Sequence, residues 1–155
     1  HLGTQKRMLV ISGPNAGGKS ITLKMLGLLQ VMVQSGLFVT AEGENRFGLF
    51  KHIYSEIGDN QSIENELSTY SYRLKRMKTF LSISNSETLL LLDEFGSGSD
   101  PELGGALAES IFESLYHKKI FAVLTTHYSN IKIRAIQLPH AINGCMLFNS
   151  FKTLK

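Results

Sequence analysis

The sequence predicts an α/β fold with a mainly parallel β-sheet flanked by helices. Short apolar runs of strand length alternate along the chain with longer stretches of helical periodicity, which is typical of this class. The run TLLLL (residues 88–92) has the continuity of a strand that is buried on both faces of a parallel sheet. Polar residues begin directly after such runs, so we expect the functional loops at the carboxyl edge of the sheet.

The amino-terminal part of the chain predicts a strand, a loop and a helix in that order. The strand covers Met8–Ser12 (MLVIS), and the helix covers residues 19–35. Because this helix is apolar on most of its surface, we expect other parts of the protein to cover it on more than one side. A glycine-containing connector (GLFVTAEGENRFG) follows, and residues 49–54 predict the next strand.

The rest of the chain predicts two more helices and two more strands. The first of these helices is expected over about residues 68–81, with Ser68 as its N-cap. After the TLLLL strand, Pro101 is expected to open a helix that ends at about Tyr116. Residues 120–125 predict another buried strand, which the polar segment THYSN follows. The apolar residues expected on one face of the helix that begins at Pro101 are Leu103, Leu107, Ile111 and Leu115.

Length and composition indicate one globular domain over residues 1–155, which we interpret as a fragment of a larger protein. The chain is 43% hydrophobic and 19% charged, and its net charge of +3 is too small to indicate a nucleic-acid-binding surface by itself. A single cysteine, Cys145, excludes an internal disulfide. Polar residues interrupt the long apolar stretches, so we expect a cytoplasmic protein without a membrane span. The pattern assigns no helix or strand to the tail at about 136–155.

The segment GPNAGGKS fits the pattern G-x-x-x-x-G-K-[ST] of a phosphate-binding loop, and it lies between a predicted strand and a predicted helix. Glycines let the backbone turn tightly and point N–H groups at phosphates, which would also lie at the positive end of the helix dipole. Lys19 would bridge phosphate oxygens, and Ser20 would be one ligand of Mg²⁺. The alternative is a glycine-rich turn that matches by chance. The candidate nucleotide-binding residues are Gly13, Pro14, Asn15, Ala16, Gly17, Gly18, Lys19 and Ser20.

Two acids follow the TLLLL strand directly. Asp93 has the position of a Walker B acid, which holds Mg²⁺ directly or through water. Glu94 would orient and deprotonate the water that attacks the nucleotide, because it points into the same cleft. Two solvated acids at a strand end are the alternative, but the phosphate loop in the same chain favours the metal and the general base.

Three other features have both a functional and a structural interpretation. His127 follows a predicted strand and could donate to the γ-phosphate or hold the water, although a lone histidine is more often structural. The segment ELSTYS places Ser68 and Thr69 at a helix start that would attract an anion, and GSGSDP places Asp100 just beyond the two acids. A helix cap and a turn are the alternatives. The basic cluster Arg73, Lys75, Arg76 and Lys78 is interpreted as a solvated helix face.

Several motifs in order resemble the ATPase domain of the MutS family of DNA mismatch-repair proteins. They are GPNAGGKS, IGDNQSIENELSTYS, LLLLDEFGSGSDPELGGALA and TTHY, and the resemblance extends from Met8 to about Ala135. It is strongest to the MutS-two branch, which lacks the mismatch-reading domain and is associated with suppressing recombination and handling branched DNA. Ile21 stands where the mismatch-recognising members have Thr, which also favours this branch.

The resemblance implies a P-loop ATPase of the ABC type that works as a head-to-tail homodimer with two composite ATP sites. One subunit would supply the phosphate loop, Asp93, Glu94 and His127, and its partner would supply Ser68 and Thr69 in trans. Asp100 would lie in the loop that crosses the dimer axis. DNA, mismatched or branched, would bind mostly through regions outside these residues.

Three hypotheses of function follow. The first is an Mg²⁺-dependent ATPase that hydrolyses ATP to ADP and phosphate by direct attack of water, and thereby couples ATP to DNA binding. The second is a nucleotide-gated dimerisation module with negligible hydrolysis, which would need neither Glu94 nor His127. The third is the nucleotide-binding domain of an ABC transporter, which is disfavoured because LSTYS stands where the transporter signature Leu-Ser-Gly-Gly-Gln is expected.

Overall fold

A computed structural model describes residues 2–3, 5–14, 17–58, 66–97 and 101–146. For residues 66–69 and 101–102 it describes the backbone and not the side chains. In the described ranges the chain forms one five-stranded sheet in the order β2-β3-β4-β1-β5, and every pair of neighbouring strands is parallel. The predicted α/β class with a parallel sheet flanked by helices is therefore confirmed. The strands are β1 (Met8–Ser12), β2 (His52–Glu56), β3 (Thr88–Leu92), β4 (Phe121–Thr125) and β5 (Ala141–Cys145); the helices are α1 (Lys19–Gln34), α2 (Glu66–Ile83), α3 (Pro101–His117) and α4 (Ser129–Gln137).

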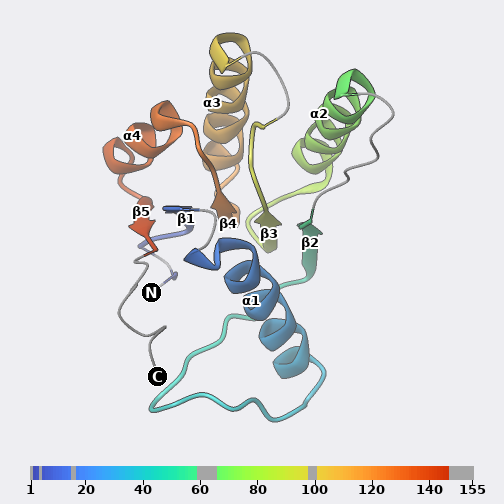
Figure 1. The fold of residues 1–155 in the computed structure, drawn as a ribbon. Coiled ribbons are helices and arrows are strands. Elements are labelled where there is room, and N and C mark those ends of the chain that lie inside the picture. Colours follow the sequence, from blue (N-terminus) through green and yellow to red (C-terminus); the bar gives the residue numbers. More distant parts are fainter. Residues whose placement is uncertain (1, 4, 15–16, 59–65, 98–100, 147–155) are drawn as a thin grey trace, which may run out of the picture.

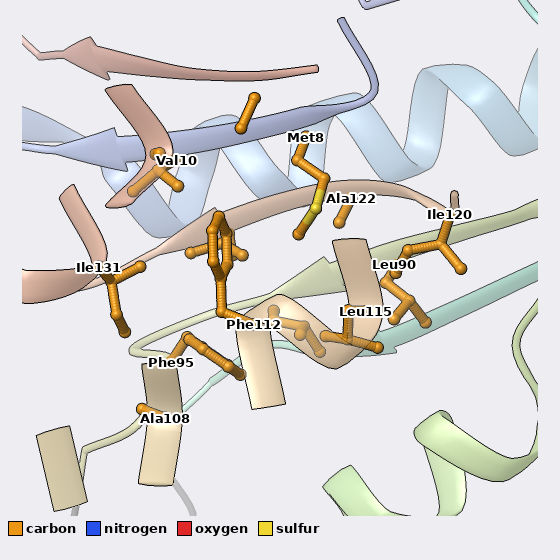
Figure 2. Close-up of a cluster of buried hydrophobic side chains, with 14 of the residues drawn as sticks. Met8, Val10, Leu90, Phe95, Ala108, Phe112, Leu115, Ile120, Ala122 and Ile131 are labelled. Atoms are coloured by element: carbon orange, nitrogen blue, oxygen red, sulfur yellow. The ribbon is translucent and has the colours of Figure 1, made fainter. Parts of the chain in front are cut away.

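The sheet separates two apolar clusters of unequal size. Helices α2, α3 and α4 lie on one face and α1 lies on the other, as Figure 1 shows. Along β3, Leu90 and Leu92 belong to the larger cluster, while Leu89 and Leu91 belong to the smaller one beside α1. This alternation is the two-residue period of a strand, and it explains why TLLLL is apolar throughout. Figure 2 shows the larger cluster, in which Phe112 from α3 fills the space between the sheet and its helices.

Helix α1 is covered on one side within the described residues, so the cover expected on a second side does not come from the described part of this chain. Leu23 faces the sheet and is fully buried. Ile21, Met25 and Leu28 are 71%, 54% and 62% exposed on the outer side of the helix. Among the described helices, α1 alone lies on this face of the sheet, and its outer side remains exposed.

Strand β2 begins three residues later than predicted, at His52 instead of Leu49. The reason is a side chain that replaces the strand hydrogen bonds of Phe50. The amide nitrogen of Gln34 donates to the Phe50 carbonyl at 3.0 Å, and the Phe50 N–H donates to the Gln34 carbonyl oxygen at 2.9 Å. Leu49 is consequently held in the connector, where it is 82% exposed. The strand starts only where its backbone reaches β3.

Two helices differ in detail from their predicted form. Helix α2 begins at Glu66, so Ser68 lies in its first turn and is not its N-cap. Glu and Leu are good helix formers, which accounts for the earlier start. On α3, Leu115 is fully buried but Leu103 is 71% exposed. Gly105 lies close to Tyr128, since a Cβ atom on it would be 3.3 Å from the Tyr128 ring. The buried residues of this helix are Gly104, Gly105, Ala108, Phe112 and Leu115, so three of the four predicted positions are replaced by a neighbouring residue.

The sequence pattern did not predict α4 or β5. Ile131 and Ala135 of α4 are fully buried in the larger cluster. Strand β5 (AINGC) has no continuous apolar run, and it is identified by its pairing with the outer side of β1 from Met8 to Ser12. The addition of β5 makes β1 an internal strand. Among the described helices, none has both the length and the apolarity that crossing a lipid bilayer requires.

Candidate nucleotide site

The topology brings three of the predicted functional segments to one edge of the sheet. Strands β3, β4 and β1 are neighbours in that order, and they run parallel. Their carboxyl ends therefore lie side by side, and the register keeps them level, because Ile11 pairs with Thr125 and Leu124 pairs with Leu92. Strands are about 4.8 Å apart, so the ends of β1 and β3 are about 10 Å apart with the end of β4 between them.

Glycine is required at the start of the loop after β1. Gly13 has a φ of 128°, a region that residues with a side chain rarely adopt, and a Cβ atom there would lie 2.9 Å from the carbonyl oxygen of Met146. Gly17 donates its N–H to the Pro14 carbonyl at 3.0 Å, which closes a turn. Gly18 is the N-cap of α1 with a φ of 80°. Asn15 and Ala16 lie outside the described residues.

Lys19 and the first turn of α1 follow the loop. Lys19 is only 4% exposed, and its Nζ donates to the carbonyl oxygen of Gly13 at 2.8 Å, so the ammonium group lies against the first residue of the loop. The first turn of α1 has no side-chain cap and no acidic residue. Its amide groups and dipole are consequently available to an anion. Ser20 is half-buried in the same turn.

A residue that the sequence analysis did not single out holds the two acids. The hydroxyl of Thr125, the last residue of β4, donates to Asp93 Oδ1 at 2.6 Å and accepts the N–H of Glu94 at 2.8 Å. The Thr125 carbonyl accepts the N–H of Phe95 at 2.7 Å. Thr125 is fully buried, so water does not compete for these bonds. Its place in TTH, two residues before the predicted His127, was the one sequence signal for this role.

The backbone at Glu94 is in the left-handed region, with a φ of 49°. A non-glycine residue rarely adopts this conformation, and the surrounding structure must hold it there. Thr125 does so on both sides of the residue through the bonds to Glu94 and Phe95. Gly96 then lets the chain pass close to α3, since a Cβ atom on it would lie 2.7 Å from the Cβ of Ala108. The half-buried carboxylate of Glu94 has no ion pair or hydrogen bond within the described residues.

His127 lies at the same edge, two residues after β4, with an exposed side chain. Its position is set by Thr126, whose buried hydroxyl donates to the Phe95 carbonyl at 3.0 Å and accepts the N–H of Tyr128 at 3.1 Å. The imidazole makes no hydrogen bond to the described part of the chain. The side chains of Ser68 and Thr69, and the whole of Asp100, lie outside the described residues.

The basic cluster on α2 is not a fully solvated face, so that interpretation is corrected. Arg73 and Arg76 are half-buried. Arg76 pairs with Glu56 at 3.3 Å and its guanidinium lies 4.8 Å from the ring centre of Phe80. Arg73 donates to Ser97 in the turn after Glu94. The two arginines are separated by three positions and face the sheet together.

The fold and the edge site define a parallel α/β domain with a glycine loop and two acids at the ends of nearby strands. Residues 9–150 match the family model of MutS domain V, and the chain belongs to this family. Its relatives carry the name Endonuclease MutS2, which places it in the MutS2 branch. The relative from Shouchella clausii (strain KSM-K16) is 48% identical over 148 residues, which are 96% of this chain and 19% of the relative.

Two further relatives of the same name have similar identities and coverage. The protein from Lactobacillus acidophilus is 47% identical over 153 residues, and that from Lactiplantibacillus plantarum is 46% identical over 154 residues. Each alignment covers 99% of this chain and 19% of the relative. The chain therefore spans about a fifth of the length of the curated relatives that it matches.

Proposed function

We propose that this chain is the Mg²⁺-dependent ATP-binding and ATP-hydrolysing domain of a MutS-like protein of DNA repair and recombination control. In this proposal it is a P-loop domain of the ABC type. The single observation that carries the proposal is the placement of the glycine loop, Asp93–Glu94 and His127 at the ends of three neighbouring parallel strands. The open carboxyl edge of such a sheet is where ligands bind in this class of fold.

The loop of residues 13–18 fits the phosphates of a nucleotide. Gly13 and Gly18 adopt left-handed conformations that suit a tight phosphate-binding turn, and the start of α1, which has no side-chain cap and no acidic residue, is electrostatically favourable to an anion. Lys19 is held inside the loop by the Gly13 carbonyl, a partner that a phosphate oxygen would replace with a charge-assisted bond. A buried ammonium at this position is therefore better explained by phosphate binding than by a simple turn.

The donor set at the strand ends fits a magnesium ion. Asp93 accepts the Thr125 hydroxyl at Oδ1, and its Oδ2 has no hydrogen-bond partner among the described residues, so this oxygen can bind a cation. Ser20 offers a hydroxyl from the first turn of α1. Within the described ranges no three His, Cys, Asp or Glu side chains cluster, which suits Mg²⁺, because it is usually held by one or two protein groups together with phosphates and water. When bound, the ion would neutralise charge on the phosphates.

Glu94 is proposed as the residue that positions the attacking water and accepts its proton. Its carboxylate is half-buried beside Asp93, and Thr125 holds its backbone in a conformation that costs free energy. Such a fixed orientation supports catalysis by positioning, in which the direction of the carboxylate matters more than its strength as a base. His127 would donate a hydrogen bond to the γ-phosphate or hold the same water.

The proposed assembly is a head-to-tail homodimer with two composite sites. Ser68 and Thr69 belong to the first turn of α2, where helix geometry favours contact with an anion from the partner's site. Asp100 would link the two sites across the dimer axis. ATP would close this dimer and hydrolysis would release it, which would change the grip of the full protein on mismatched or branched DNA. A location in the cytoplasm remains a prediction.

A nucleotide-gated dimerisation module with negligible hydrolysis is the second candidate. It requires the phosphate loop and α2, but it gives no reason for the held conformation at Glu94. The two candidate functions therefore differ in the role that they give to Glu94, and a substitution of Glu94 distinguishes them.

The test replaces Glu94 by Gln in the intact gene product. We expect kcat for ATP hydrolysis to fall at least about 100-fold, because the general base is lost, while ATP affinity changes little. Steady-state phosphate release and equilibrium ATP binding measure the two quantities. Glu56→Gln is the matched control, since Glu56 lies at the end of neighbouring β2 and pairs with Arg76. An unaltered hydrolysis rate in Glu94→Gln would sink the assignment of the base.

Sedimentation of Glu94→Gln with and without Mg-ATP tests the proposed assembly. An ATP-dependent shift from monomer to dimer that Ser68→Ala abolishes would support the composite sites. If ATP changes nothing in the sedimentation of the intact protein, the trans role of Ser68 and Thr69 is wrong.

A further inference from the structure

The two halves of helix α2 have different surroundings. A small open cavity of about 30 Å³ lies between α2 and α3, beside the carboxyl end of β3. The residues that line this cavity are mainly apolar, and Asp93 and Glu94 are among them. The carboxyl-terminal half of α2 is anchored differently, because Phe80 is buried in the larger cluster. The helix thus has one end in the core and the other beside a cavity. Apolar side chains on the cavity wall are Leu74, Met77, Leu107 and Ile111.

Arg73 spans the rim of this cavity. Its Nη1 donates to the hydroxyl of Ser97 and lies 3.4 Å from the Ser97 carbonyl oxygen. Ser97 in turn donates its N–H to the Glu94 carbonyl at 3.0 Å, which closes the turn of residues 94–97. A continuous path of hydrogen bonds therefore leads from the guanidinium of Arg73 to the backbone of Glu94.

The turn of residues 94–97 is consequently held from two sides that differ in rigidity. On the sheet side, fully buried Thr125 fixes the N–H groups of Glu94 and Phe95. On the helix side, Arg73 fixes Ser97 through a half-buried contact beside the cavity. A buried bond in a close-packed core has little freedom, whereas a polar contact beside a cavity can follow a displacement of α2.

We propose that Arg73 is a positioning residue for Glu94, so that the position of α2 sets the direction of the hydrolytic carboxylate. The inference rests on the proposed ATPase function and adds a means of regulating it. Helix α2 also carries Ser68 and Thr69 in its first turn, which is proposed to face the partner's nucleotide. One helix would then connect the nucleotide of one composite site to the general base of the other.

The chemistry of Arg73 suits this role. The guanidinium is planar and carries several donors in a fixed geometry, so it can reach a hydroxyl and a carbonyl oxygen of one residue together. Arg76, three positions on, is held by Glu56 and by the ring of Phe80 instead. It has the same charge and similar burial, but it does not contact the turn after Glu94, and it therefore serves as the matched control.

The experiment compares Arg73→Met with Arg76→Met in the intact protein. We expect Arg73→Met to lower kcat about 10-fold and to leave the Kd for ATP unchanged within about twofold, since a misdirected base slows the chemical step without removing phosphate contacts. Arg76→Met should leave kcat within about twofold of the unsubstituted protein. Arg73→Lys retains a charged donor and should recover most of kcat. Thermal unfolding of each variant shows whether the loss of kcat follows a loss of folded protein.

Two further variants separate this role from a structural one. In the Glu94→Gln background, Arg73→Met should lower the residual rate no further, because Arg73 acts through Glu94. Ser97→Ala removes the hydroxyl partner and leaves the carbonyl partner, so a smaller loss of kcat than in Arg73→Met is expected.

Three outcomes would contradict the proposals at different levels. If Glu94→Gln keeps full hydrolysis, the proposed ATPase mechanism itself is wrong. If Glu94→Gln loses hydrolysis but Arg73→Met does not, only the role of Arg73 is overturned. The role of Arg73 is also overturned if Arg73→Met and Arg76→Met lower kcat equally and in proportion to their loss of thermal stability.

Discussion

The loop of residues 13–18 and the turn of residues 94–97 lie at the same edge of the sheet, but different interactions hold them. The turn is held by hydrogen bonds from fully buried Thr125 at the end of an internal strand. The loop is held by glycine conformations and by the bond from Lys19 to the carbonyl of Gly13. The turn thus depends on the buried end of β4, whereas the described part of the loop depends on its glycine conformations and on the close approach of Gly13 to Met146.

The difference indicates how the two halves of the site would respond to a nucleotide. Thr125 holds the acids through bonds that are buried within the chain, so we expect the acids to be preorganised for a ligand. To contact a nucleotide, Lys19 would exchange the Gly13 carbonyl for a phosphate oxygen. We therefore expect the loop to adjust when a nucleotide binds. Substitutions in the loop should therefore act mainly on ATP affinity, and substitutions around the turn should act mainly on kcat.

The largest effect is expected for Lys19→Met. It should weaken ATP binding at least about 100-fold, because the buried ammonium would form charge-assisted bonds with the phosphates. The temperature of unfolding should change little, since the lost hydrogen bond to Gly13 is offset by the removal of a buried charge. Equilibrium binding of ATP to the intact protein measures the effect. Lys24→Met, an exposed position of the same helix, is the control. Unchanged affinity in Lys19→Met would contradict the phosphate role of the loop.

An intermediate effect is expected for Thr125→Val. The loss of its hydroxyl leaves Asp93 and the N–H of Glu94 without their partner, so we expect kcat to fall about 10-fold or more and stability to fall by about 1–3 kcal/mol. ATP affinity in the absence of Mg²⁺ should not change. Thr88→Val is the control: Thr88 is equally buried and bonds to Asn85 at the opposite end of β3. Equal loss of kcat in both variants would show that Thr125 acts only through stability.

Two glycines of the loop should differ only in how much an alanine at each position lowers stability. Gly13→Ala places a Cβ 2.9 Å from a backbone oxygen at a φ of 128°, and it should destabilise the fold by more than about 2 kcal/mol. Gly18→Ala meets no heavy atom within 4 Å, so only the strain of its φ of 80° remains, about 1–2 kcal/mol. Calorimetric unfolding of the intact protein compares them. Equal shifts would mean that the contact with Met146 yields at little cost.

Strong local patterns predicted the parts of the molecule that have a repeating or chemically restricted sequence. The TLLLL strand was correct at both ends, because a strand buried on two faces must be apolar at every position. Helix α1 was correct to within one residue, because the glycine loop marks its start. The positions of Lys19, Asp93, Glu94 and His127 at one edge followed from the parallel order of the strands.

Elements whose form depends on a distant partner were predicted less well. The start of β2 moved because Gln34 of α1 satisfies the backbone of Phe50, which no local pattern reveals. Strand β5 has no apolar run, since pairing with β1 alone defines it. The interpretation of Arg73 as solvated failed because its partner, Ser97, is 24 positions away in the chain.

The sequence by itself determined the class of fold, the strand, loop and helix around Lys19, and the pair of acids at the end of β3. These features are local, and residue type and spacing specify them directly. The tertiary structure alone decided that Thr125 holds both acids, that Glu94 has a left-handed backbone, and that Arg73 reaches the turn after it. Each of these is a contact between separate elements, and such contacts exist only after the sheet and its helices have packed.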